Sequence, residues 1–198
     1  MLSSIHPFGE RSRSNSFSHT ATAHIIGSGL GGAALGVLAG ALGAVLTFLL
    51  APSSTARTAI VLAATVGAFV IEATKRERIL PTRSRQVNEN WLQTYRGWVY
   101  GGGWGAELGF GISTIITTSL VHLLLVAMVL VGSFPVAVLL GTVFGLVRGA
   151  TILAAHGVDS PEQLRTLHQR LDSLRNHSRS GVLFSLVLAT FVGIGGMW

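Results

Sequence analysis

The chain has 198 residues, of which 49% are hydrophobic and only 11% are charged, against roughly a quarter in soluble domains. The absence of cysteine excludes disulfide bonds, thiolate metal sites and thiol redox chemistry. The net charge of +6 could indicate a nucleic-acid partner, but the basic residues lie between apolar stretches and form no single face, so we expect no nucleic-acid binding.

The chain begins with a polar, serine-rich segment, residues 1–23, which we expect to be a disordered cytoplasmic tail. An apolar stretch of 27 residues follows, from His24 through Leu50. This stretch exceeds the roughly 20 residues that a helix needs to cross a bilayer and the roughly 15 of a signal-peptide core. It therefore predicts an uncleaved transmembrane helix, with cleavage near Ala51-Pro52-Ser53 as the alternative.

Further apolar stretches follow, and together they predict an all-α polytopic membrane helical bundle. We expect a single transmembrane domain over residues 24–198, with five transmembrane helices and two cytoplasmic interfacial amphipathic helices. A count of four or six spans stays open, because the second stretch is short and residues 97–105 are ambiguous. The predicted spans are residues 25–50, 58–73, 108–131, 135–155 and 181–196, and the cytoplasmic connections are residues 74–107 and 156–180.

Both connections contain a predicted amphipathic helix. In the first, residues 88–98 place aromatic and apolar side chains on one helical face, as in a helix that lies in the membrane interface. These side chains are Trp91, Leu92, Tyr95 and Trp98.

In the second connection, Ser160, Pro161 and Gln163 are a helix start signal. Leucines then recur at spacings of three and four, and lipid headgroups, the protein's own cytoplasmic ends or a partner helix could cover them. This leucine stripe comprises Leu164, Leu167, Leu171 and Leu174.

The distribution of arginine and lysine predicts the orientation, because these residues stay on the cytoplasmic side. The tail and the two connections hold twelve of them, whereas the opposite side has only Arg57. We therefore expect a multi-pass protein of the cell membrane, with a cytoplasmic N-terminus and with Trp198 outside.

Glycines recur every fourth residue in two of the predicted spans. Small residues let helix backbones approach closely, which drives helix association in lipid. We expect these glycines to pack helices within the chain, with dimerisation as the alternative. They are Gly32, Gly36 and Gly40 in the first span and Gly141, Gly145 and Gly149 in the fourth. Gly101-Gly102-Gly103 differs, because it precedes the third span and could form a break or re-entrant turn.

Polar residues within the predicted spans point to a candidate site. Thr114, Thr118 and His122 fall on one stripe of the third span. Arg148 interrupts the fourth span, where a charge costs roughly 2.5–3.5 kcal/mol. The tight turn at residues 132–134 makes these two spans an antiparallel hairpin, which brings Arg148 level with the polar stripe. We expect these four residues to form a pocket for a small anion or polar solute.

Residues 105–155 resemble the transmembrane unit of the CcdA and DsbD family of reductant conductors. The similarity lies in Gly109-Phe110-Gly111, a polar patch, an apolar run that ends in Gly132-Ser133, and then Gly141 and Gly145 in the next helix. Members of that family carry electrons on paired membrane cysteines. Because this chain has none, the resemblance implies only a related helix-hairpin scaffold, of a kind that small-solute exporters could share.

Three classes of function remain open. An intramembrane enzyme is least supported, because the spans contain no Gly-x-Ser-x-Gly motif, no His-Glu-x-x-His motif and no paired aspartates. A small transporter is favoured slightly over a structural or regulatory subunit of a membrane complex. We expect no catalytic residue, cofactor or metal site; the expected partners are the lipid bilayer and either a second copy of the chain or another membrane protein.

Overall fold

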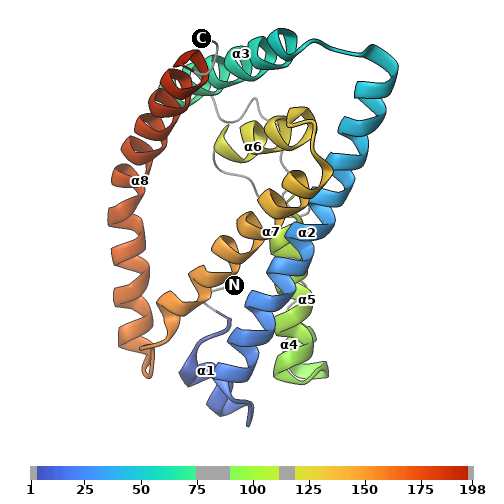
Figure 1. Ribbon diagram of the computed structural model, residues 1–198. Helices are drawn as coiled ribbons and strands as arrows, with labels where there is room; N and C mark the ends of the chain where they lie inside the picture. The colour runs from blue at the N-terminus through green and yellow to red at the C-terminus, as the bar shows by residue number, and fades with distance from the viewer. Residues whose placement is uncertain (1–3, 75–89, 112–118, 196–198) are drawn as a thin grey trace.

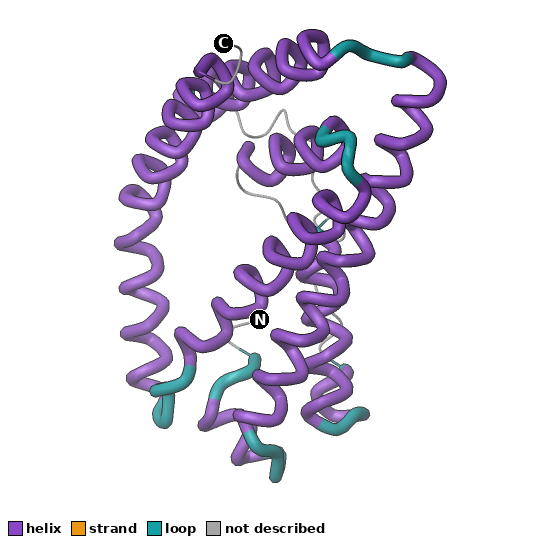
Figure 2. The backbone as a smooth tube through the Cα atoms, viewed as in Figure 1, coloured by secondary structure: helices purple, strands orange, loops and turns teal. Residues whose placement is uncertain are grey.

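The computed structural model describes residues 4–74, 90–111 and 119–195, and within these ranges the protein is helical without strands (Figure 1, Figure 2). The helices are α1 (Pro7–Ser12), α2 (Phe17–Leu50), α3 (Ser54–Ala73), α4 (Trp91–Thr94), α5 (Gly97–Phe110), α6 (Ser119–Leu130), α7 (Phe134–Ala150), the 3-10 helix η2 (Thr151–Ala155) and α8 (Pro161–Gly195).

Three helices among the described residues are long and apolar enough to cross a membrane. They are α2, α3 and the continuous helix Phe134–Ala155 formed by α7 and η2. They coincide with the first, second and fourth predicted spans. Many of their large apolar side chains point outward, such as Phe48 and Leu139, which is expected when the surrounding solvent is lipid.

The third predicted span, residues 108–131, is not one continuous described helix. Helix α5 ends at Phe110, because Gly111 has a φ of +73°, a backbone conformation that glycine adopts without strain. Helix α6 is described from Ser119 to Leu130. Residues 101–103, where a break or re-entrant turn could form, lie inside α5 and are helical.

The fifth predicted span and the helix before it are also different from the prediction. Helix α8 runs continuously for 35 residues, so residues 156–180 are not a connection separate from a span at 181–196. No proline follows Pro161 to interrupt it. The predicted start signal is present: the Gln163 amide donates to the Ser160 hydroxyl oxygen (3.3 Å), and the Asp159 amide donates to the Gln163 side chain (2.6 Å).

The predictions for the N-terminal tail and for the first interfacial helix also differ from the structure. The expectation of disorder is wrong for residues 7–12 and 17–23, which are helical, because the tail folds back and buries Glu10. Residues 88–98 do not form one helix. Tyr95 and Arg96 are extended between α4 and α5, which leaves Trp91 packed against Gly103 and Trp98 exposed.

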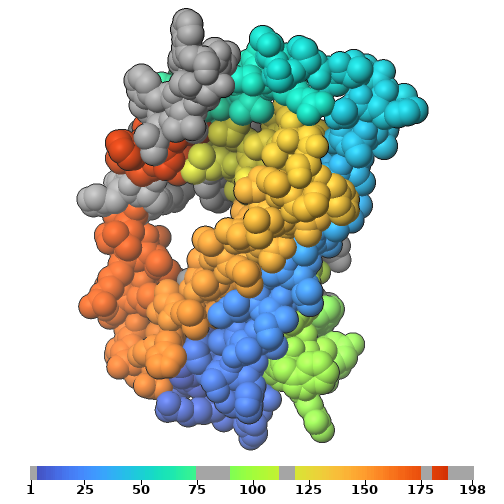
Figure 3. Space-filling model, viewed as in Figure 1, coloured from blue at the N-terminus to red at the C-terminus, as the bar shows by residue number. Residues whose placement is uncertain are grey.

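Helix α2 is the centre of the fold. Helix α5 lies parallel to its N-terminal half, and α7 crosses it in the antiparallel direction (Figure 1, Figure 3). The six glycines singled out in the sequence all lie at the α2–α7 interface, and a second set lies between α2 and α5. The contacts that define both registers are Gly105 with His24, Gly109 with Ser28, Gly36 with Ala137, Gly32 with Gly141, and Gly145 with Ser28.

Ser28 is the point where α2, α5 and α7 meet. Its hydroxyl donates a hydrogen bond of 2.6 Å to the carbonyl oxygen of Gly145, and its own carbonyl oxygen lies against Gly109 on one side and Gly145 on the other. The residue is fully buried. Backbone atoms of three helices thus pack directly on one another, a geometry that side chains larger than hydrogen would prevent.

Helix α8 runs along the opposite side of the molecule and packs against α3 near its C-terminal end (Figure 1). At its other end the preceding loop is attached to α1, because the Phe8 amide donates to the Val158 carbonyl oxygen and Arg11 forms an ion pair with Asp159. Between these two attachments, the space-filling view shows an opening between α7 and α8 (Figure 3).

Candidate functional site

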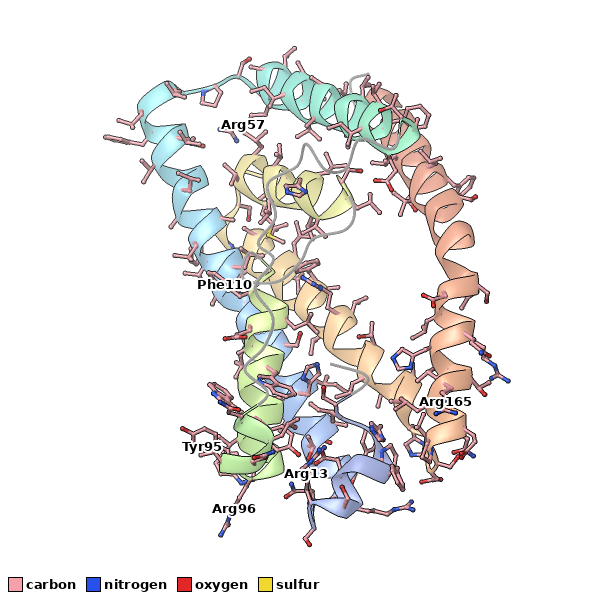
Figure 4. All side chains as sticks on the ribbon, turned by 180° about the vertical axis from the view of Figure 1, so that it is seen from behind. Arg13, Arg57, Tyr95, Arg96, Phe110 and Arg165 are labelled. Atoms are coloured by element: carbon pink, nitrogen blue, oxygen red, sulfur yellow. The ribbon has the colours of Figure 1, made fainter. Side chains whose placement is uncertain are left out.

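The chain leaves the helical conformation at Gly111, which places the C-terminal end of α5 inside the bundle. Helix α5 has 14 residues and is about 21 Å long, and the 12 described residues of α6 span about 18 Å; a hydrocarbon core is about 30 Å thick. Phe110, the last residue of α5, lies near the middle of the molecule (Figure 4). The polar C-terminal end of α5 therefore needs partners from neighbouring helices.

Arg148 of α7 lies at the C-terminal end of α5. Its guanidinium carbon is 5.3 Å from the centre of the Phe144 ring, a cation–π distance. Its Nη1 atom is 3.6 Å from the position that a Cβ atom on Gly111 would occupy. The C-terminal end of a helix carries a partial negative charge, so a cation is favourable here. This placement offsets part of the cost of an arginine within a membrane helix.

At Ser119, the first described residue of α6, the arrangement is the opposite. Glu72 in the last turn of α3 accepts two hydrogen bonds from Ser119 at its Oε2 atom, one from the backbone amide (3.2 Å) and one from the hydroxyl (2.8 Å). Its side chain is buried, with 4% of the residue exposed. The N-terminal end of a helix carries a partial positive charge, so the carboxylate is favourable at this end.

We use the name helix-break site for these two places together. Arg148 and Phe144 lie beside Gly111 at the end of α5, and Glu72 is hydrogen-bonded to Ser119, the first described residue of α6. Interrupted helices whose ends lie at membrane depth are a recurring way to bind ions and small charged solutes in transporters. Chemically, this arrangement can bind and orient a charged or polar molecule.

The structure places the predicted pocket residues as follows. Arg148 is half-buried at the helix-break site, and His122 is half-buried on α6, one turn beyond Ser119. Thr114 and Thr118 lie outside the described residues. Ser119, which directly follows the predicted pocket residue Thr118, is hydrogen-bonded to Glu72.

Sequence reasoning missed Glu72 as a site residue. The signal was present, because Glu72 is a carboxylate inside a stretch predicted to cross the membrane, and such residues mark functional sites by default. Gly111 was noted as part of Gly109-Phe110-Gly111 and was not recognised as a helix end. A lone glycine in an apolar run is common, so nothing in the sequence distinguished it.

A second polar cluster holds the N-terminal segment against α5. Glu10 is fully buried and accepts hydrogen bonds from Tyr100 (2.6 Å to each carboxylate oxygen), Thr20 (2.8 Å) and Arg13 (2.7 Å). Burial alone would lower the pKa of Arg13, but its hydrogen bond and charge interaction with Glu10 outweigh this effect and raise it. Both carboxylate oxygens of Glu10 accept hydrogen bonds from within the cluster, which indicates a structural attachment and not an open binding site.

Tyr100 provides a test of this cluster. Burial, followed by the hydrogen bond to Glu10 and the charge of Glu10, raises its pKa from 10.0 to about 12. The folded state therefore keeps the phenol proton more tightly than the unfolded state. The resulting stabilisation is complete below pH 10 and is lost as the pH rises from about 10 to about 12. The chain has two tyrosines, so ultraviolet titration of the Tyr95→Phe variant should show a single phenolate transition near pH 12.

The matched control is Tyr100→Phe, which should show no transition centred near pH 12 and should lose less stability between pH 10 and 12 than the wild type. A transition of the Tyr95→Phe variant at pH 10 in the folded protein would contradict the arrangement of Glu10 around this phenol.

Comparison of the chain with protein-family models, with curated proteins and with solved structures finds no match.

Proposed function

We propose that the protein is a multi-pass membrane protein that transports a small anion or another small polar solute, which binds at the helix-break site. The observation that supports this proposal is the placement of Arg148 at the end of α5 and of Glu72 at Ser119, the first described residue of α6. Charged groups at membrane depth are costly and usually line solute pathways. A packing role alone would require neither charge.

The proposed orientation has the N-terminus in the cytoplasm of the cell and the end of α8 outside. Arg13, Arg96 and Arg165 lie toward one end of the molecule, whereas Arg57 lies at the other (Figure 4). This separation agrees with the preference of basic residues for the cytoplasmic side. For residues 105–155, the resemblance to the CcdA and DsbD unit extends the proposal only to a shared hairpin scaffold, here α6 and α7.

The experiment is uptake of small anions by protein reconstituted in liposomes, with Arg148→Gln as the test variant. A hydrogen bond to a charged group contributes about 1.5–3 kcal/mol, so loss of the guanidinium should weaken binding about ten- to hundredfold. Binding of the same anions to detergent-solubilised protein gives an independent measurement. The sample must elute as a folded protein with an unchanged unfolding midpoint.

Arg165→Gln is the matched control, because Arg165 is an exposed arginine on α8 whose loss changes the net charge by the same amount. This variant should transport and bind like the wild type. If folded wild-type protein takes up no solute, or if Arg148→Gln matches Arg165→Gln, the transport proposal is wrong.

A second candidate function is that of a non-catalytic subunit of a membrane complex, and one observation favours it. The leucine stripe on α8 is only partly covered within the described structure, since Leu171 is 38% exposed and Leu174 is 55% exposed. Another membrane protein or a second copy of the chain could cover it. Replacement of both leucines by serine would then release a partner that co-purifies with the wild type, whereas a transporter that acts alone would be unaffected.

A further inference from the structure

An apolar groove of about 380 Å³ lies where α2 approaches the turn between α6 and α7. Eleven residues line it, and only Thr47 and Ser133 among them have polar side chains. The groove follows α2 from Gly40 to Phe48, which corresponds to about 12 Å along the helix axis. This part of α2 belongs to a helix that is long and apolar enough to cross a membrane.

Arg57 of α3 lies at the rim of this groove. Its Nη2 atom donates a long hydrogen bond of 3.4 Å to the hydroxyl of Thr47, and its Nη1 atom lies against Gly132. Thr47 and Gly132 both line the groove. Among the described residues, Thr47 is the hydrogen-bond partner of Arg57, and no described carboxylate forms an ion pair with it. A guanidinium has five N–H donors, so most of them can serve a ligand.

We propose that this groove binds an anionic phospholipid, with the headgroup phosphate on Arg57 and the upper part of one acyl chain along α2. The guanidinium matches a phosphate group in geometry and charge. Arg57 lies at the end of the molecule opposite Arg13 and Arg96, so its charge is isolated from the other labelled arginines (Figure 4). This inference is independent of solute transport at the helix-break site.

The order of polar and apolar groups favours a whole lipid over a free anion. The charge is at the rim, at the start of α3, and the apolar walls continue from it toward the middle of α2. A phosphate ion would use Arg57 alone and would leave the groove unfilled. A phospholipid would use both parts, with its phosphate near the interface and its chain in the hydrocarbon region.

Electron paramagnetic resonance with spin-labelled lipids tests the proposal. The protein is reconstituted in phosphatidylcholine vesicles that contain a small fraction of spin-labelled phosphatidylglycerol or spin-labelled phosphatidylcholine. An arginine at the membrane surface contributes about 1 kcal/mol, so the wild type should immobilise the anionic lipid about fivefold more strongly than the zwitterionic one. Arg57→Gln should reduce this preference to about one.

Two further variants keep the test independent of folding defects in Arg57→Gln. Ala44 lines the groove and is exposed, so Ala44→Trp fills the groove and should abolish the immobilised anionic lipid while Arg57 is retained. Arg96→Gln removes an exposed arginine at the other end and should preserve the preference.

Three outcomes would overturn the proposal. The first is equal immobilisation of the two lipids by the wild type, and the second is an unchanged preference in both Arg57→Gln and Ala44→Trp. The third is complete displacement of the lipid by inorganic phosphate added to the vesicles, because the apolar groove would then contribute nothing.

Discussion

Replacement of Gly145 by valine should destabilise the protein by about 3 kcal/mol or more, at the upper end of the range for overpacked interiors. A Cβ atom at this position would overlap the carbonyl oxygen of Ser28, which is backbone and cannot move without shifting α2. The same displacement would break the hydrogen bond from the Ser28 hydroxyl to the Gly145 carbonyl oxygen. The measurement is the thermal unfolding midpoint of the purified protein in detergent.

Gly67→Val is the matched control. Gly67 also lies within an apolar helix, α3, but a Cβ atom there would have nothing within 4 Å. We expect this variant to change the free energy of unfolding by no more than about 0.5 kcal/mol. Equal midpoints for the two valine variants would show that α2 and α7 do not pack through their glycines.

Replacement of Glu10 by alanine should cost about 3 kcal/mol, the lower end of the range for breaking a buried ion pair. The change leaves Arg13 and the Tyr100 hydroxyl without the carboxylate that both contact, and it leaves a cavity between α1 and α5. The lower end applies because the Arg13 side chain keeps 25% of its surface exposed. The unfolding midpoint should fall, and limited proteolysis should cut near α1.

Asp159→Ala is the control, because it breaks the second ion pair in the same region. The Arg11–Asp159 and Arg13–Glu10 pairs have the same N–O distance of 2.7 Å, but the side chains of the first pair are 69% and 50% exposed. Solvent screens such a pair, so its loss should cost no more than about 1 kcal/mol. If both alanine variants lose the same stability, burial of Glu10 does not strengthen its contacts.

The sequence predicts three of the apolar helices, α2, α3 and the helix formed by α7 and η2, because their signal is local. A long run of apolar residues such as 25–50 predicts both a location in lipid and a helical backbone. Lipid offers no hydrogen-bond partners, so the backbone N–H and C=O groups of such a segment must bond to one another within it. The spacing of the glycines also predicts helix packing. The four-residue repeat that begins at Gly32 identifies the face of α2 that contacts α7.

The features that were missed depend on contacts between distant parts of the chain. Glu10 lies in a polar segment that looks disordered until Tyr100, 90 residues later, is placed beside it. The end of α5 depends on the backbone conformation of Gly111, which the apolar residues on both sides conceal. The pairing of Glu72 with Ser119 joins residues 47 positions apart, and hydropathy contains no information on such pairs.

The central position of α2 has a consequence for biosynthesis. Both of its glycine faces are covered by helices that the ribosome makes later, α5 and α7. At about 5–20 residues per second, the roughly 100 residues between the end of α2 and the end of α7 take about 5–20 s to synthesise. During that interval α2 resides in the bilayer with two small-residue faces open to any neighbouring helix. The insertion machinery must therefore keep nascent copies apart until α7 has emerged.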